Sequence, residues 1–239
     1  MGLLDVQIST GWEKFLSDPA VIRQLETISA FLEGREYYPY ENKVMRFLEV
    51  PLDKLKHIIV GMDPYPSWDA VHGCPQATGR SFEVSELSDA GWDYKIAQAS
   101  LRNIVKAIYA IDRGQIASMA KVREEIASGE FRIAPPSRWF SAMEEQGVMF
   151  LNASLTVEPG KPGSHEKIWS GFSTILAEYI GREKPDVTWH LWGNAARERY
   201  APLLPEASVL VCCHPRMASF VSENTLRLAD DINWTGVEG

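Results

Sequence analysis

The chain has 239 residues, of which 45% are hydrophobic and 23% are charged, and its formal net charge at pH 7 is −8. This size and composition are typical of a globular protein with a sizeable core and exclude a low-complexity chain. The acidic balance argues against a general nucleic-acid binder, although an acidic enzyme can still carry a local basic patch.

Several further classes are disfavoured by patterns that the sequence lacks. It contains no run of about 18 apolar residues and no basic segment followed by an apolar stretch at its start, so we expect a cytoplasmic protein without a membrane partner. Its three cysteines, Cys74, Cys212 and Cys213, predict no disulfide framework. Because only His72 and Cys74 are spaced to share a metal ion, we expect no metal and no cofactor.

Apolar residues at helical spacing predict three long helices, at residues 19–33, 100–111 and 165–180. The first begins after Asp18-Pro19, which is a common start signal, and Ile22 belongs to its apolar set. For the third, we expect Ser164 to cap the start and Gly181 to end the helix.

Short apolar runs predict four buried strands, at residues 57–60, 148–151, 187–192 and 208–213. Strands that alternate with helices imply crossover connections, and therefore a mainly parallel sheet with helices on both faces. No linker rich in Gly and Ser divides the chain. We therefore predict a single α/β domain, residues 1–239, with a central four-stranded sheet.

Polar residues follow the predicted strands at their carboxyl ends. Asp63 follows the first strand, Asn152 the second, Asn194 the third and His214 the fourth. Ligands of parallel sheets bind beyond these ends, so a carboxylate, an amide and an imidazole should meet in one cleft. The pattern indicates an α/β enzyme but does not identify its substrate.

Residues 61–65 (GMDPY) resemble the GQDPYH motif of the main family of uracil-DNA glycosylases. Other segments are similar to that family's motifs in the same order: residues 76–82 to QAHGLCF, 100–104 to SLxNI, 146–157 to QGVLLLNAxLTV, 214–215 to the start of HPSPL and 232–234 to IDW. The resemblance runs from about residue 38 to residue 234, with residues 1–37 as an N-terminal helical extension. It implies that family's α/β fold and an enzyme of base excision repair that flips uracil out of DNA and hydrolyses its N-glycosidic bond without a metal.

The resemblance also implies roles for particular side chains. Asp63 would stabilise the positive charge that develops on the sugar and orient or deprotonate the attacking water. His214 would donate a hydrogen bond to uracil O2 as negative charge develops there. Asn152 would pair with N3–H and O4 of the flipped base, and Phe82 would stack on its ring. Tyr65 would lie against C5 and exclude the methyl group of thymine.

Contacts with DNA are implied in the same way. Ser100 and Ser164 would contact the DNA, and the backbone around Met62 would contact the base or the water. The phosphate contacts are expected among basic residues near the site segments, with two or three of the following taking part: Arg80, Arg102, Lys106, Lys161, Lys167, Arg197 and Arg216.

Three departures from the family lie before or within the DNA-contacting segments. Pro66 replaces the final histidine of GQDPYH, which is a supporting group in the family. The loop from Pro66 to Pro75 is about six residues longer than the family's, so it either reshapes the rim that faces DNA or is a tolerated insertion. Residues 97–99 replace a proline run that compresses the DNA backbone, which predicts a weaker grip on DNA.

The fourth departure lies in the loop at residues 214–218, where the family has a leucine that fills the hole left by the flipped base. That leucine falls on Ala218, which is too small to fill the hole, so we predict that Met217 or Arg216 acts as the wedge. Phage inhibitor proteins that mimic DNA bury this loop, so we predict weak inhibition or none. The expected partner is uracil-containing DNA, single- or double-stranded, and the expected state is a monomer.

Other functions stay open at this point. A related glycosylase could act on another base, although Tyr65 and Asn152 together favour uracil. A non-catalytic DNA-binding homologue would not require Asp63, Asn152 and His214 together. An unrelated hydrolase or nucleotide enzyme has no support, since the sequence contains no GxGxxG, Walker or GxSxG motif. Structural explanations also exist for each residue, such as a turn at Asp63 or core packing at Phe82.

Overall fold

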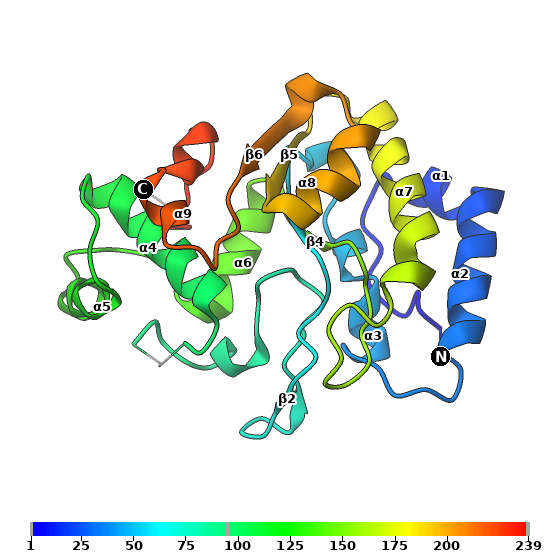
Figure 1. Cartoon of the computed structure of the whole chain (residues 1–239), viewed down its shortest axis with the longest axis horizontal. Helices are drawn as coiled ribbons and strands as arrows, with labels where there is room; N and C mark the ends of the chain where they lie inside the picture. The colour runs from blue at the N-terminus through cyan, green and yellow to red at the C-terminus, as the bar shows by residue number, and fades with distance from the viewer. Residues whose placement is uncertain (1, 94–95, 238–239) are drawn as a thin grey trace.

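The predicted strands form one parallel sheet at the centre of the protein (Figure 1). The computed structural model describes residues 2–93 and 96–237. The sheet has the order β4-β1-β5-β6 and is built from β4 (Val148–Asn152), β1 (His57–Gly61), β5 (Thr188–Trp192) and β6 (Val209–Cys212). All neighbouring pairs are parallel, and the register places Gly61 beside Asn152 at the carboxyl edge. The four-stranded parallel sheet expected from the sequence is therefore confirmed.

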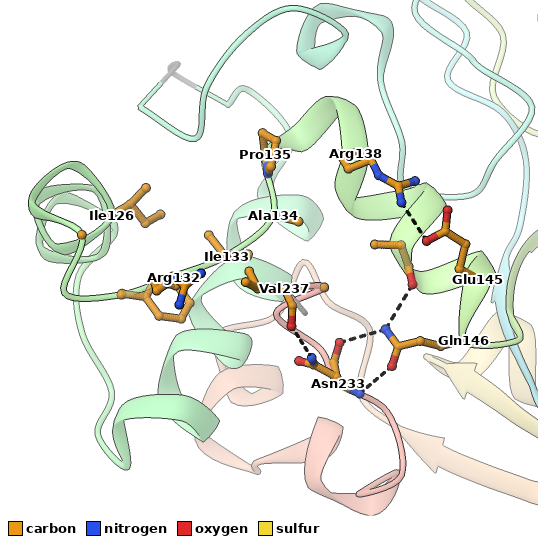
Figure 2. Close-up of a pocket in the computed structure, with 14 residues that line it drawn as sticks. Ile126, Arg132, Ile133, Ala134, Pro135, Arg138, Glu145, Gln146, Asn233 and Val237 are labelled. Atoms are coloured by element: carbon orange, nitrogen blue, oxygen red, sulfur yellow. Dashed lines mark hydrogen bonds and ion pairs between the residues drawn. The ribbon is translucent and has the colours of Figure 1, made fainter. Parts of the chain in front are cut away.

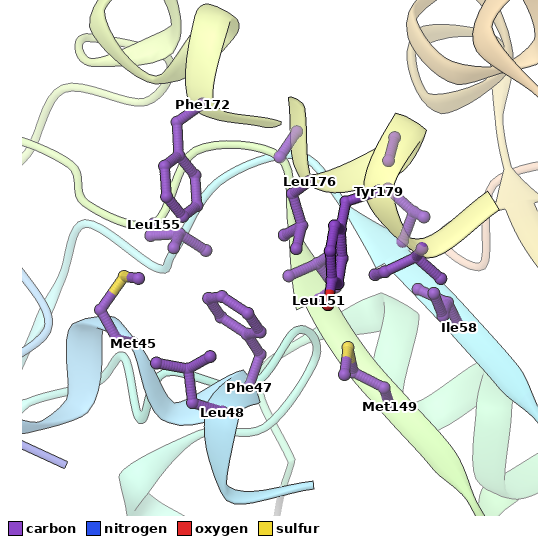
Figure 3. Packing of buried hydrophobic residues seen from close by; sticks show 14 of the residues in the cluster. Met45, Phe47, Leu48, Ile58, Met149, Leu151, Leu155, Phe172, Leu176 and Tyr179 are labelled. Atoms are coloured by element: carbon purple, nitrogen blue, oxygen red, sulfur yellow. The ribbon is translucent and has the colours of Figure 1, made fainter. Parts of the chain in front are cut away.

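Helices cover both faces of the sheet and enclose two cores, because alternate residues of each strand point to opposite faces. Ile58 and Val60 of β1 enter a core with α2 (Pro19–Leu32) and α7 (Glu166–Glu183), part of which Figure 3 shows. Ile59 enters a second core with α4 (Ala99–Arg113), α6 (Pro136–Glu145) and α9 (Ser219–Ser222). The sheet thus separates two apolar layers within a single domain.

Short elements complete the fold: α1 (Glu13–Leu16), α3 (Glu41–Val44), α5 (Met119–Ser128), α8 (Asn194–Tyr200), and a hairpin of β2 (Trp68–Asp69) and β3 (Cys74–Pro75). In the N-terminal extension, Trp12 and Phe15 are fully buried in the core beside α7, so this segment is part of the domain. None of the helices in the described part of the chain combines the length and the apolar character needed to cross a membrane.

The predicted helices exist, but their ends differ from the expectation. Asp18 caps α2 by accepting a hydrogen bond from the Ala20 amide at 2.7 Å, whereas Ile22 is 41% exposed and lies outside the core. The predicted boundaries of α7 were wrong. Ser164 makes no cap, because its Oγ accepts a hydrogen bond from the Glu158 amide at 2.9 Å, and the helix continues through Gly181 to Glu183.

Candidate active site

A cavity of about 180 Å³ opens at the carboxyl edge of the sheet, where the sequence predicts that the polar residues meet. It is lined by Val60, Gly61, Met62, Asp63, Pro64, Tyr65, Pro66, Arg80, Phe82, Ser100, Asn152, Pro162, Trp192 and His214. All the residues that the sequence analysis assigns to catalysis and base recognition are in this set. Asn194, by contrast, begins α8 and does not line the cavity.

A larger groove of about 920 Å³ lies between α5, α6 and the C-terminal segment (Figure 2). Its polar lining includes Arg132, Gln146 and Asn233. The Gln146 side chain donates to the Asn233 carbonyl at 3.1 Å and accepts from the Asn233 amide at 2.8 Å. None of the predicted site residues faces this groove. The smaller cavity is therefore the candidate active site.

Asp63 lies in the turn that follows β1, at the floor of the cavity. Its Oδ2 accepts a hydrogen bond from the Gly163 amide at 2.7 Å, which fixes the carboxylate from the opposite loop. Burial raises the pKa of Asp63 above its ordinary value; the Gly163 amide opposes this shift and the nearby Glu166 carboxylate adds to it. The Met62 carbonyl accepts a hydrogen bond from the Ser154 amide at 2.9 Å, so the turn is anchored to the loop after β4.

His214 is held as a neutral ring, and its second nitrogen has no hydrogen-bond partner among the described residues. Its Nδ1 accepts a hydrogen bond from the Arg216 amide at 3.1 Å, so the proton of the neutral ring resides on Nε2. Burial lowers the pKa of His214, and the positive charge of Arg216 lowers it further. Gly193, at φ +100°, allows this position, since a Cβ there would lie 2.9 Å from the His214 Cβ. The Nε2–H group can therefore donate to a ligand in the cavity.

Asn152 ends β4 and is 4% exposed. Within the described residues, no protein group is hydrogen-bonded to its side-chain amide, which leaves one donor and one acceptor for a ligand. Gly61, its partner across β1 and β4, makes room for it. A Cβ at Gly61 would collide with the Asn152 Oδ1 and would lie 2.7 Å from the Ser81 Cβ.

Phe82 adopts a left-handed backbone conformation with φ 64°, which costs a non-glycine residue on the order of 1–3 kcal/mol. Ser81 holds this segment against the sheet by donating from Oγ to the Ile59 carbonyl at 3.1 Å. The Phe82 ring lies 5.5 Å from the Trp192 ring and 6.4 Å from the His214 ring, measured between centroids. The strained backbone thus places an aromatic face beside the imidazole.

Arg80, one of the seven candidates for the two or three phosphate contacts, is buried inside the protein. Its side chain is 7% exposed and is bound by carboxylates, with Nε 2.6 Å from Glu144 Oε1 and Nη1 2.9 Å from Glu83 Oε1. Glu83 also pairs with Arg46 at 3.1 Å. This buried chain of charges flanks Phe82 on both sides in the sequence, and the sequence analysis did not predict it.

The other residues predicted to contact DNA differ in whether they line the cavity or lie on the exposed surface. Ser100, at the start of α4, lines the cavity. Arg216, Met217 and Ala218 are exposed on the loop after β6. Ser164 is exposed but does not line the cavity, since its Oγ is bound to the Glu158 amide.

The phosphate contacts expected of Lys161 and Arg102 compete with partners inside the protein. Lys161 pairs with Glu158 at 2.6 Å, and Arg102 donates to the carbonyls of Ile96 and Ala97 at 2.7 and 2.6 Å. Sequence reasoning also missed three residues of the site, because each reaches it from a distant loop or strand: Pro162, Gly163 and Trp192.

Comparisons with known proteins identify relatives of this chain. No family model matches the chain. The uracil-DNA glycosylase of Dichelobacter nodosus is 30% identical over 250 residues, covering 96% of this chain and 96% of the relative. That of Azobacteroides pseudotrichonymphae is 32% identical over 219 residues, covering 89% of this chain and 86% of the relative.

Solved structures show the same fold. The UNG structure from Nitratifractor salsuginis has a TM-score of 0.70 at 23% identity, covering 93% of this chain and 90% of its own. The mimivirus uracil-DNA glycosylase has a TM-score of 0.62 at 22% identity, covering 85% of this chain and 66% of its own. On the strength of these sequence relatives, and with solved structures of uracil-DNA glycosylases that share its fold, this chain belongs to the uracil-DNA glycosylase family.

Proposed function

We propose that this protein excises uracil from DNA by hydrolysing the N-glycosidic bond, and leaves an abasic site for base excision repair. The observation that carries this proposal is the meeting of Asp63, Asn152 and His214 in one cavity of about 180 Å³, in a chain that belongs to this family. A base inside a duplex cannot reach such a cavity, so the target nucleotide must flip out of the stack. We further propose that the protein acts in the cytoplasm, with the DNA.

Recognition of uracil follows from the groups around the cavity. The free amide of Asn152 offers an acceptor for N3–H and a donor for O4, a pattern that cytosine does not match. Phe82 supplies a face on which the ring stacks. Tyr65 lines the cavity and packs against the second core, so it is held in place as a steric barrier to a C5 methyl group.

Cleavage of the N-glycosidic bond leaves negative charge on the base and positive charge on the sugar, and the site has a group that stabilises each of them. The Nε2–H of His214 donates to O2 of the departing uracil, where negative charge develops; one such donor contributes roughly 3–4 kcal/mol. The Asp63 carboxylate stabilises the sugar cation and orients the attacking water, which adds its oxygen to C1′ and gives one proton to this carboxylate. The base leaves as an anion, and water supplies the hydroxyl of the abasic site.

The test is release of uracil from an oligonucleotide that carries a single uracil, measured in EDTA with alkali to cleave abasic sites. Strand cleavage is expected for uracil and none for an otherwise identical oligonucleotide with thymine. Parallel oligonucleotides with hypoxanthine or a thymine mismatch test the alternative substrates. Each oligonucleotide is tested as a single strand and as a duplex. If the parent cleaves neither form, the proposal is wrong and a binding role is favoured.

The activity should fall on the acid side of its pH profile with the titration of Asp63. Burial raises the pKa of this carboxyl, and the reaction uses its ionised form, so kcat/KM is lost as pH falls through a value above that of an ordinary aspartate. His214 should add no loss near neutral pH, because its lowered pKa keeps the ring neutral. A profile that is flat from neutral pH down to the ordinary aspartate range would contradict this assignment.

Tyr65→Ala should admit thymine, because it removes the ring that lies in the wall of the cavity. We expect abasic sites at thymine with the variant and none with the parent, with uracil excision kept at a lower rate. Tyr65→Phe is the matched control, since it keeps the ring and loses only the hydroxyl. Thymine excision by neither variant would show that the barrier lies elsewhere.

Met217 is the proposed wedge of the loop after β6. It is 50% exposed, and its carbonyl accepts a hydrogen bond from the Asn103 side chain at 3.2 Å, which fixes the loop against α4. Met217→Ala should slow excision from duplex DNA more than from single strands, because only a duplex leaves a hole to fill. Equal rates for parent and variant on duplex DNA would exclude Met217, and Arg216→Ala would then test the other candidate.

The altered loop also bears on inhibitors. Mimivirus UNG variants have been solved in complex with UGI. In this chain Ala218 falls where the family has leucine, so we propose weak inhibition, or none, by inhibitors that mimic DNA and bury that side chain. We further propose a monomer. Stoichiometric inhibition at low protein concentration would contradict the first statement.

A further inference from the structure

The proposed mechanism of uracil excision does not use the hairpin at residues 66–75. Its strands β2 and β3 pair antiparallel, with Trp68 opposite Pro75 and Asp69 opposite Cys74. Figure 1 shows the hairpin extending beyond the carboxyl ends of the central strands, which is the edge at which the cavity opens. A DNA strand that places a base in the cavity must therefore approach from the side on which the hairpin projects.

The hairpin is continuous with the wall of the cavity. Pro66 lines the cavity, and its carbonyl accepts a hydrogen bond from the Gly160 amide at 2.8 Å. Trp68 follows Pro66 by two residues, so their Cα atoms are at most about 7 Å apart. Because successive nucleotides of a stacked strand are about 3.4 Å apart, Trp68 lies within a few nucleotides of a base held in the cavity.

Hydrogen bonds inside the hairpin hold its shape. Asp69 is 2% exposed, and its Oδ1 accepts from the amides of Val71 and His72 at 3.0 and 3.2 Å. Its Oδ2 accepts from Ser85 Oγ at 2.8 Å and lies 2.6 Å from the His72 ring, whose other nitrogen lies 2.9 Å from Asp89. Hydrogen bonds within the hairpin, together with those to Ser85 and Asp89, therefore hold its tip in place.

Trp68 is a half-exposed aromatic side chain on this hairpin. It is 49% exposed, and its ring lies 6.1 Å from the ring of Tyr38, which is 6% exposed. Tyr38 is itself fixed by backbone hydrogen bonds to and from Val157 at 2.9 Å. Residues 66–75 contain no lysine or arginine, so this hairpin offers stacking rather than an ion pair with phosphate.

We propose that Trp68 stacks on an unpaired base within a few nucleotides of the flipped uracil, so that the hairpin adds affinity for single-stranded DNA that duplex DNA does not gain. The inference rests on the proposed function and adds a strand preference to it. A base in a single strand exposes a face to the indole, whereas a base in a duplex has both faces covered by its neighbours. The hairpin should thus contribute to binding of single strands and little to binding of duplexes.

Steady-state kinetics on single-stranded and duplex oligonucleotides with one uracil test this, using the parent, Trp68→Ala, Trp68→Phe and Val71→Ala. We expect Trp68→Ala to raise KM for the single strand by roughly 5- to 150-fold, the loss of one stacked base, with kcat near the parent value. Trp68→Phe should recover most of the loss. Val71, 81% exposed on the same hairpin but without a ring, is the matched control and should behave as the parent.

The salt dependence separates stacking from charge. The slope of log KM against log salt should be the same for the parent and Trp68→Ala, because no phosphate contact is lost. An unchanged KM for Trp68→Ala on single strands, an equal loss on duplexes, or an equal loss in Val71→Ala would overturn the inference. Thermal unfolding verifies that each variant is folded.

Failure of the proposed function would look different, since the parent itself would then release no uracil. In that case fluorescence anisotropy with a uracil-free single strand still measures the contribution of Trp68. Weaker binding by Trp68→Ala than by Trp68→Phe supports the stacking role, and equal binding by the two refutes it.

Discussion

Replacing Asp63 with asparagine is expected to lower the rate of uracil excision by roughly 10²- to 10⁴-fold, the usual contribution of a positioned acid–base group. Asparagine has nearly the same shape and can still accept a hydrogen bond from the Gly163 amide, which lies 2.7 Å from Asp63 Oδ2. It cannot carry the negative charge that stabilises the sugar cation. The loss should therefore appear in the rate constant measured under single-turnover conditions, while binding of the uracil strand is kept.

The stability of this variant should not fall, and this distinguishes chemistry from folding. Burial raises the pKa of Asp63, which means that the native protein disfavours the charge, so removing the charge does not weaken the fold. Asp53→Asn is the control, because Asp53 is an exposed carboxylate that accepts a hydrogen bond from Thr10 and lies outside the cavity. If Asp63→Asn kept the parent rate, Asp63 would be a structural turn residue and the mechanism above would be wrong.

Replacing Arg80 with leucine, the residue that the family has here, should destabilise this protein by about 3–5 kcal/mol. The change leaves Glu144 buried without its partner, and Glu83 keeps only Arg46. Burial already raises the pKa of Glu144 even with Arg80 beside it, so loss of the guanidinium leaves this carboxylate still less favoured. Chemical denaturation at neutral pH measures the effect.

Two further variants separate the charge from the packing. Arg80→Leu combined with Glu144→Leu should recover most of the stability, because replacing both members of a buried pair with apolar residues is often neutral. Lys14→Leu breaks an exposed pair with Glu183 at 2.8 Å and should cost about 1 kcal/mol or less. If Arg80→Leu and Lys14→Leu lowered the free energy of unfolding equally, the buried ion pairs of Arg80 would stabilise the fold no more than an exposed ion pair does.

The parts of the site that follow directly from strand ends could be predicted from the sequence. Asp63, Asn152 and His214 each come at or just after a run of apolar residues, and parallel strands bring such positions to one edge. The local order of residues therefore contains enough information for this part of the cavity. Phe82 and Tyr65 were found by motif resemblance, because nothing in their spacing separates them from core residues.

Other features depend on contacts between distant segments, which periodicity does not report. The amide of Gly163 reaches Asp63 across 100 positions of the chain, and Glu144 reaches Arg80 across 64. A buried arginine and an exposed one look alike in a sequence, so Arg80 was placed with the phosphate contacts. The end of α7 was misjudged for a related reason. Packing of Tyr179 and Ile180 in the core outweighs the low helix propensity of Gly181, so the helix continues to Glu183.

The side chain of Asn103 has a mechanical consequence for the enzyme on DNA. It spans from α4 to the carbonyls of Pro215 and Met217, at 2.7 and 3.2 Å, one turn along from Ser100. The start of α4 and the loop after β6, the two segments proposed to contact DNA, are thus joined by one side chain, so a displacement of the loop is transmitted to the helix.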